Sequence, residues 1–241
     1  MVSYQAFMPK KIIFIFVLVL SSQLAHTQGN LTELDYKRFR LGFSLGTNYM
    51  HLDLINSELE QDGKIYYGQV SQVLPGFAVG LITDLRLNRY FNLRATPTLL
   101  LGERHLYFKA LDVATGVLED DKKVNLFSLP IDFPVSIRYG AERYGNFKPF
   151  VQVGGGTYFD LGRDELTEVT LQLFDLYYSV GMGCEIYFKY FKLSPELKLN
   201  IGAMNVLSPK YITDDTVATL KYTNAISSIL SRVLVFSLNI E

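Results

Sequence analysis

The sequence has almost no cysteine and no excess of positive charge. Cys184 is the single cysteine among 241 residues, which excludes an intrachain disulfide and a cysteine-based metal site. A formal net charge of −1 provides no basic surface of the kind that binds nucleic acid. We therefore expect no nucleic-acid partner, and the function has to be inferred from other features of the chain.

Long apolar runs are also missing after the first 20 residues. The run "IIFIFVLVL", residues 12–20, follows Lys10 and Lys11 and is shorter than the about 20 residues that cross a bilayer. It is typical of the apolar region of a signal peptide. After Leu20 no run approaches the length of a membrane helix, so any membrane crossing must use strands.

The N-terminal segment predicts export. Small residues after the apolar run allow cleavage after Thr27, with Ala25 at the −3 position. This predicts a signal peptide over residues 1–27. Residues before Met8 add no charge to it, so Met8 is as good a start of translation as Met1.

What the chain does have is alternation with a period of two. In "SLPIDFPVSIRYG", residues 128–140, every second position is apolar and the positions between are mostly polar, as in a strand with one apolar face. The same pattern predicts eight strands, over 40–54, 76–87, 92–104, 128–140, 150–162, 174–188, 192–202 and 232–241.

The links between these segments alternate in length. Short links at 88–91, 141–148 and 189–191 alternate with long polar links at 55–75, 105–123, 163–173 and 203–225. This rhythm is typical of outer-membrane barrels, which have short periplasmic turns and long outer loops. We predict an all-β fold, an eight-stranded antiparallel up-and-down transmembrane β-barrel over residues 40–241, preceded by a short periplasmic segment over 28–39.

Two features predict that the polar face points into the barrel. Glycine crowds that face, as expected where side chains converge inside a narrow closed sheet: Gly42, Gly46, Gly76, Gly80, Gly154, Gly156, Gly181 and Gly183. Aromatic residues gather at both ends of the segments, like the girdles of a membrane barrel: Tyr90, Phe91, Tyr139, Tyr144, Phe147, Phe188, Tyr190 and Phe191 at the short turns, and Tyr49, Tyr107, Phe108, Phe159 and Phe174 at the long links. Pro130, Pro134 and Pro195 should mark bulges or gaps in the ladder.

The soluble alternative is a lipocalin-like barrel, which also has eight strands and a secretion signal. Its apolar face would point inward to a ligand cavity and its outer face would be polar. Glycine on the supposed outer face and aromatics at both strand ends disfavour it.

Charged residues on the inward face predict a structural network. Positive and negative side chains balance, which favours a neutralised plug over an ion-selective pore lined by one sign. The predicted lumen network is Asp84, Arg86, Arg94, Asp132, Arg138, Glu185, Glu196 and Lys198. Since an eight-stranded barrel is barely wide enough for its own side chains, the chain should not conduct folded cargo.

Catalysis needs a nucleophile, a base and an orienting group within reach of one another. Candidates for a lipid-modifying site are His51, His105 and Glu103, with Ser57 or Ser71 as nucleophile. Nothing in their spacing requires such a site, so we expect no catalytic residues, no metal, no cofactor and no small-molecule substrate.

Two short motifs carry little weight. "GGG" at 154–156 lies within a predicted strand and no helix follows it, which disfavours a phosphate-binding loop and favours close packing. "DTV" at 215–217 resembles a short O-glycosylation motif of Bacteroidota, and three residues match easily by chance.

Several longer strings resemble the PorT family of Bacteroidota outer-membrane proteins. They are "GFSLGTNYM", "PGFAVGLITDLRLNRYFNLRATPTLLLGER", "SLPIDFPVSIRYGAERYGNFKPFVQVGGGTYFDLGR" and "SPELKLNIG", and the resemblance runs from about residue 31 onward. It implies a non-enzymatic accessory or assembly role in type IX protein secretion and, in gliding species, motility. The expected partners are outer-membrane lipid and other secretion-system proteins.

The alternatives to this function are a stand-alone structural or adhesive barrel and, third, a lipid-modifying enzyme. The last strand ends at Ile240 where an aromatic is the more familiar signal for barrel assembly.

Overall fold

A computed structural model describes most of the chain after the N-terminal segment. The described residues are 37–57, 59–61, 63–162, 171–207 and 224–241. The predicted signal peptide, most of the 28–39 segment and the motif at 215–217 lie outside them. Among the described residues, no helix is long and apolar enough to cross a membrane.

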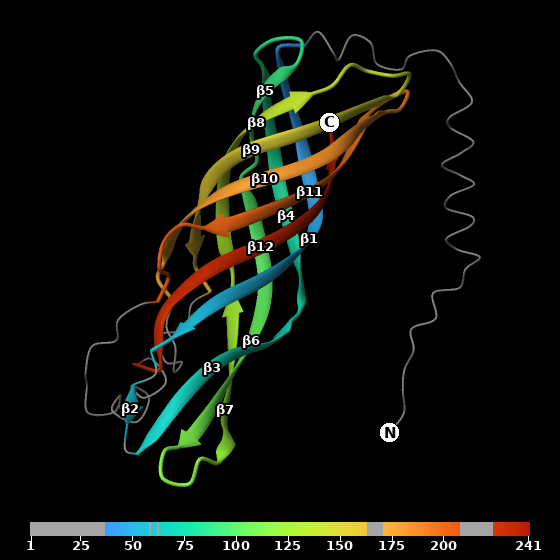
Figure 1. Ribbon diagram of the computed structural model, residues 1–241. Helices are drawn as coiled ribbons and strands as arrows, with labels where there is room; N and C mark the ends of the chain where they lie inside the picture. The colour runs from blue at the N-terminus through green and yellow to red at the C-terminus, as the bar shows by residue number, and fades with distance from the viewer. Residues whose placement is uncertain (1–36, 58, 62, 163–170, 208–223) are drawn as a thin grey trace, which may run out of the picture.

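The described residues form one antiparallel sheet of twelve strands (Figure 1). The strands are β1 (Phe39–Asn56), β2 (Glu60–Gln61), β3 (Lys64–Val73), β4 (Pro75–Arg86), β5 (Phe91–Ala95), β6 (Thr98–Asp112), β7 (Leu118–Ser128), β8 (Pro130–Gly140), β9 (Phe147–Asp160), β10 (Phe174–Tyr187), β11 (Lys192–Gly202) and β12 (Ile226–Ile240).

Three pairs of these strands are single barrel strands with a short interruption. β3 and β4, β5 and β6, and β7 and β8 follow each other directly, and the interruptions fall beside Pro75, Pro97 and Pro130. Proline has no N–H to donate to the ladder, so it belongs at such gaps. Pro134 and Pro195 lie within strands and pair with Gly156 and Leu238 on one edge. On the other edge each falls in a gap, since the β5 and β6 ladders skip Pro134 and the β10 ladder skips Pro195, as expected.

The sheet closes into a ring of eight strands. β1 pairs with β12 on one edge, and its residues 39–49 pair with 75–85 of β4 on the other edge. The ring continues from β12 through β11, β10, β9 and β8 to β5 and β6, which pair with β4. The predicted eight-stranded antiparallel barrel is therefore confirmed.

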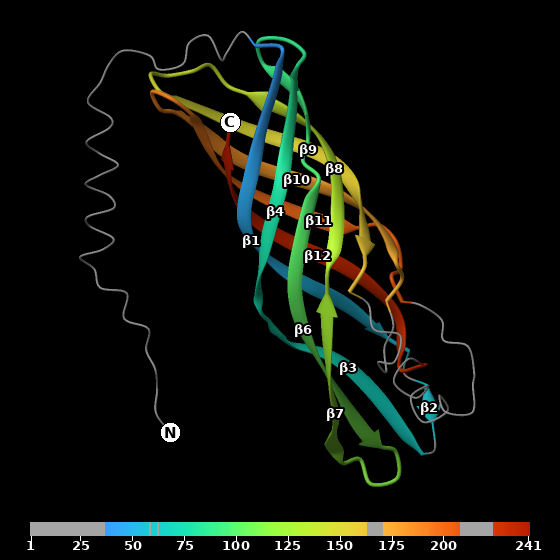
Figure 2. The ribbon, with the colours of Figure 1, turned by 180° about the vertical axis from the view of Figure 1, so that it is seen from behind.

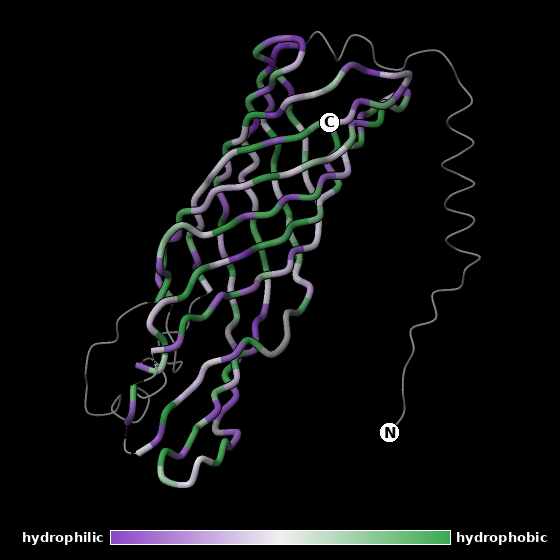
Figure 3. Tube along the Cα trace, in the orientation of Figure 1, coloured by the Kyte–Doolittle hydropathy of each residue, from purple (hydrophilic) through white to green (hydrophobic). Residues whose placement is uncertain are grey.

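The apolar face of the strands points outward. Phe77 and Leu81 are 72% and 67% exposed, whereas Asp84 and Arg94 on the inward face are 0% and 2% exposed. Figure 3 shows the alternation of hydrophilic and hydrophobic residues along the strands of the barrel wall. This is the opposite of the lipocalin arrangement, in which the apolar face lines the cavity.

Two of the long links are not loops, which corrects the prediction for 55–75 and 105–123. β3 pairs with β6, and β6 pairs with β7, so these three strands continue past the other strands as an extension of the wall (Figure 2). Burial still alternates along β6 in this stretch: Leu106, Phe108 and Ala110 are buried, whereas Lys109 between them is half-buried.

The hairpin between β6 and β7 closes with a short turn. Gly116 has a φ of 69°, in the left-handed region that glycine adopts without steric cost. The Asp112 carboxylate accepts hydrogen bonds from the backbone N–H groups of Ala114 and Thr115, at 2.9 and 3.1 Å. These two bonds stabilise the ionised carboxylate and lower the pKa of Asp112.

An apolar core lies beneath the extension and corrects the placement of one aromatic. Phe108, expected in the outer girdle, is 1% exposed and belongs to this core. The other buried members are Leu52, Tyr66, Leu106, Ala110, Val124, Leu171, Val206, Ala225, Ile226 and Ile229. The inward face is thus apolar at the long-link end and polar at the short-turn end.

The outward face predicts a membrane-dependent stability. Val135 on β8 is 52% exposed on this face. If it lies near the bilayer midplane, Val135→Arg should destabilise the barrel by about 2 to 4 kcal/mol in urea titrations of refolding in lipid vesicles, because a cation then faces hydrocarbon. Val113→Arg, in the hairpin turn of the extension, is the matched control and should cost little. Equal effects at both sites would show that the outward face is not the lipid face.

Candidate functional site: a charged plug in the lumen

Eight charged side chains meet inside the barrel near its short-turn end. We call this set the ion-pair plug: Arg40, Asp84, Arg94, Arg138, Glu185, Lys192, Glu196 and Glu241. Four are cations and four are carboxylates, and each residue is buried or has a buried side chain. The neutral side chains of Gln152 on β9 and Asn239 on β12 form hydrogen bonds to the plug. With these two, every strand of the ring contributes a residue to the network.

Asp84 of β4 is one centre of the plug. Its carboxylate accepts hydrogen bonds from Arg40 Nη2 at 2.6 Å, Arg94 Nε at 2.9 Å and Asn92 Nδ2 at 2.5 Å. Each donor comes from a neighbouring strand, because Arg40 pairs across from Asp84 on β1 and Arg94 pairs across from it on β5. The alternation of the three strands therefore brings the side chains together.

Glu241 continues the chain of ion pairs. Its side-chain Oε1 accepts a hydrogen bond from Arg94 Nη2, and its Oε2 forms an ion pair with Lys192 Nζ at 2.8 Å. Lys192 also donates to Glu185 of β10 at 3.0 Å. Two carboxylates thus share one ammonium group that is completely buried.

Arg138 of β8 joins the other side of the plug. It donates to Glu196 Oε2 at 2.6 Å and to Glu185 Oε1 at 3.3 Å, and its guanidinium carbon lies 3.6 Å from the ring centroid of Phe150. Gln152 donates to the second oxygen of Glu196 at 2.6 Å. These contacts supply the charged partners and added hydrogen bonds that buried ions require.

The structure brings five of the predicted network residues into the plug: Asp84, Arg94, Arg138, Glu185 and Glu196. Asp132 and Lys198 form a separate pair, with Lys198 Nζ 3.8 Å from Asp132 Oδ2. Arg86 lies at the mouth of the barrel, where its Nε donates to the backbone oxygen of Asn88.

Sequence reasoning missed three members of the plug. Arg40, Lys192 and Glu241 lie at strand ends, on the same inward alternation as Ser194 and Asn239. Counting that alternation to the last residue of each strand would have found them.

A pair of tyrosines fills the lumen between the plug and the apolar core. Tyr177 donates to Asp132 at 2.5 Å, and its ring stacks on Tyr158 with centroids 4.4 Å apart. Asn200 donates to the hydroxyl of Tyr158. Asp132 is thus held by a phenol and by Lys198, which satisfies a carboxylate that is 1% exposed.

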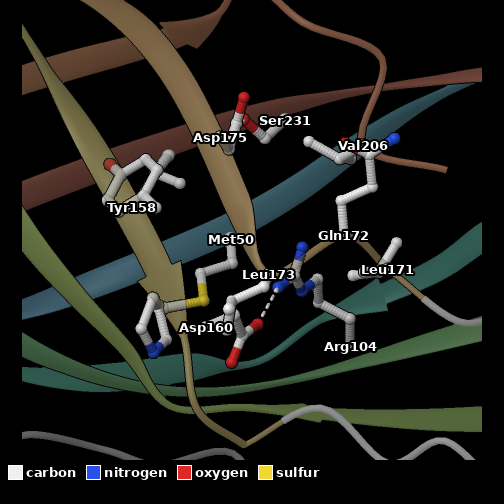
Figure 4. A pocket seen from close by; sticks show the side chains of 12 residues that line it. Met50, Arg104, Tyr158, Asp160, Leu171, Gln172, Leu173, Asp175, Val206 and Ser231 are labelled. Carbon is white, nitrogen blue, oxygen red and sulfur yellow. Dashed lines mark hydrogen bonds and ion pairs between the residues drawn. The ribbon is translucent and has the colours of Figure 1, made fainter. Parts of the chain in front are cut away.

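A small chamber lies between the tyrosines and the apolar core (Figure 4). Arg104 and Asp160 face each other across it at 4.0 Å, and Asp175 accepts a hydrogen bond from Ser231. Nε of Arg104 and Oδ1 of Asp175 are buried without a hydrogen-bond partner in the protein. Buried polar atoms of this kind are typically satisfied by water.

Glycines bring the backbones close around these layers. A Cβ at Gly76 would lie 1.9 Å from the oxygen of Leu101, and one at Gly154 would lie 2.3 Å from the oxygen of Val135. No larger residue fits at either position without a shift of the backbone. The "GGG" stretch is therefore explained by strand packing within β9.

The candidate catalytic residues have other partners. His51 lies 3.4 Å from Asp53, His105 contacts Asn125, and the Ser57 hydroxyl donates to the backbone oxygen of Asn224. Glu103 lies 3.8 Å from His105, and the side chain of Ser71 lies outside the described set. Within that set, no group of His, Cys, Asp and Glu has the arrangement of a metal site.

Removing one cation of the plug should lower the free energy of unfolding of the barrel. Arg138→Ala leaves Glu196 and Glu185 short of a partner, and should destabilise the barrel by about 3 to 5 kcal/mol in the same vesicle titrations. Arg232→Ala is the control, because Arg232 pairs with Asp53 at a site where its side chain is 56% exposed, and such pairs contribute about 1 kcal/mol or less. Equal losses for the two variants would contradict a buried plug.

A filled lumen should not conduct ions. The purified protein in a planar bilayer should show no steady conductance of porin size, because plug, tyrosines and apolar core occupy successive layers of the lumen. A large stable conductance whose ion selectivity changes in Arg138→Ala would overturn this reading in favour of a channel.

Neisserial surface protein A (NspA), a solved structure, superposes with a TM-score of 0.43 and 10% identity, covering 85% of this chain and 99% of that chain. No curated protein matches the sequence. Residues 22–208, most of the chain, match the family described as "Outer membrane protein beta-barrel domain". This chain therefore belongs to the outer-membrane β-barrel family.

Proposed function

We propose that this outer-membrane barrel is a non-enzymatic accessory or assembly component of protein secretion that acts through contacts with other proteins. The observation that supports this most directly is the ion-pair plug. A lumen closed by paired charges leaves no path for cargo or solute. On this proposal, the protein contacts its partners at the two ends of the barrel.

The assignment to type IX secretion depends on the resemblance to the PorT family of Bacteroidota. The strings that carry it lie in β1, β4 to β6, β8 to β9 and β11, and so include the strands that supply most of the plug. On this proposal the signal peptide delivers the chain to the outer membrane, and other secretion-system proteins are its partners.

A stand-alone structural or adhesive barrel is the second candidate, and the extension of β3, β6 and β7 favours it. The tip of the extension exposes neighbouring apolar side chains, with Val117 and Leu118 each more than 50% exposed. Apolar groups that are exposed side by side mark contact surfaces. A lipid-modifying enzyme is third, since neither described histidine contacts Ser57.

Deletion of the gene separates these candidates. An accessory role predicts that secreted cargo accumulates in the periplasm of the deletion strain, and that the wild-type gene restores export. An adhesive role predicts normal export with weaker attachment of cells to surfaces. Altered lipid A with normal export and attachment would support the enzyme.

Arg138→Ala supplies a matched control for this experiment. If the plug is structural, the variant should lose export in proportion to the fall in barrel level, measured by heat-modifiable migration on gels. Loss of export at an unchanged barrel level would give Arg138 a direct role in secretion and contradict a purely structural plug.

A further inference from the structure

A basic hollow lies at the short-turn end of the barrel, between the β4–β5 turn and the β8–β9 turn. Four cationic side chains line it, Arg86, Arg89, Arg143 and Lys148, together with a single carboxylate, Glu142. The hollow therefore carries a net charge of +3, whereas the plug beside it is neutral. The mechanism proposed for the plug does not use this charge.

The strand register places the hollow on the lumen side of the wall. Arg86 pairs directly across from Asn92, and Lys148 pairs directly across from Glu185. Asn92 and Glu185 are both buried in the lumen, and residues directly opposite in an antiparallel pair share a face. Two of the four cations thus face the mouth of the barrel and not the lipid.

Arg143 is held in place before any ligand arrives. Its Nε donates to the backbone oxygen of Gly145 at 2.7 Å, and its guanidinium carbon lies 3.8 Å from the ring centroid of Tyr187. Gly145 has a φ of 60°, which allows the tight turn that presents this oxygen. A positioned guanidinium loses little side-chain entropy on binding an anion.

Glu142 shows which chemical group the hollow accepts. Its carboxylate lies 3.2 Å from Arg89 Nη2 and accepts a hydrogen bond from the Tyr90 hydroxyl at 3.2 Å. The Arg89 and Glu142 side chains are 71% and 67% exposed, and exposed ion pairs are weak. A carboxylate from outside can therefore replace Glu142 at small cost.

We propose that this hollow binds an acidic segment of another protein through its carboxylates. The inference deepens the proposed function and rests on it, because it assigns the partner contact to the short-turn mouth. Carboxylates match arginine geometry, and a peptide reaches the mouth of a barrel from water. An anionic lipid headgroup is disfavoured because Arg86 and Lys148 face the lumen.

The test uses the full-length protein in nanodiscs of neutral phosphatidylcholine, with a fluorescent oligoglutamate peptide as the probe. Anisotropy titrations should show saturable binding that weakens as salt is raised. Arg89→Gln combined with Lys148→Gln should weaken binding about tenfold. Glu142→Gln should tighten binding several-fold, because it removes the internal competitor, and a merely structural role of the turn would not produce this gain.

The matched control removes two cations that do not line the hollow, Lys189 on the β10–β11 turn and Lys123 on β7. Lys189→Gln combined with Lys123→Gln should bind the probe like the wild type. If Lys148→Gln impairs folding, Arg89→Gln and Glu142→Gln, both on exposed turns, decide the test. Absence of saturable binding, equal losses in test and control variants, or no gain in Glu142→Gln would overturn the proposal.

Three further outcomes separate this inference from the proposed function and from lipid binding. Binding to phosphatidylglycerol vesicles by detergent-solubilised protein, without binding to oligoglutamate, would assign the hollow to lipid and refute the proposal. If deletion of the gene blocks export while the hollow variants bind the probe like the wild type, the inference alone fails. If deletion leaves export intact while oligoglutamate binds as expected, the secretion role fails and the ligand class of the hollow stands.

Discussion

Charges buried inside a narrow barrel must be paired, and the rest of this structure depends on that constraint. Asp84 on β4 and Glu196 on β11 lie on strands well separated around the ring, yet one continuous chain of ion pairs joins them. Each carboxylate contacts donors from two or more strands, so the loss of one strand leaves a buried charge without its partner. The plug therefore makes closure of the ring cooperative and blocks the lumen with the same contacts.

A blocked lumen moves function to the two ends of the barrel, and these ends differ in chemistry. The long-link end carries a three-stranded extension whose tip exposes the apolar side chains of Val117 and Leu118. The short-turn end carries the basic hollow around Arg89 and Arg143. A protein that contacts partners at both ends would meet apolar surface at one and positive charge at the other, so the two kinds of partner need not compete.

The sequence predicted the ring and its inside face because strand alternation is local. Gly76, Ala78 and Asp84 share one face of β4 whatever their neighbours are. The ion pairs themselves depend on register between strands, which no single segment encodes, so the partners of Arg94 could not be predicted. The extension was missed for a different reason. Outside the membrane both faces of a strand tolerate polar residues, and the charged stretch of β7 therefore reads as a loop although it pairs with β6.

The order of plug, tyrosines and apolar core along the barrel axis depends on where the strands form a closed ring. From Phe43 to Tyr49, β1 is hydrogen-bonded to β12 on one edge and to β4 on the other, and the plug lies at the short-turn end of this stretch. The β1–β4 ladder ends at Tyr49 and Pro75, and beyond it β3 continues the pairing with β6 but has no ladder with β1 among the described residues. A charge at that level lies beside a gap in the wall, and the buried Arg104, which pairs across from Val73, has Asp160 at 4.0 Å as its partner. Leu52, Ile226 and their apolar neighbours fill the lumen next to it, since apolar side chains need no partner beside an open ladder.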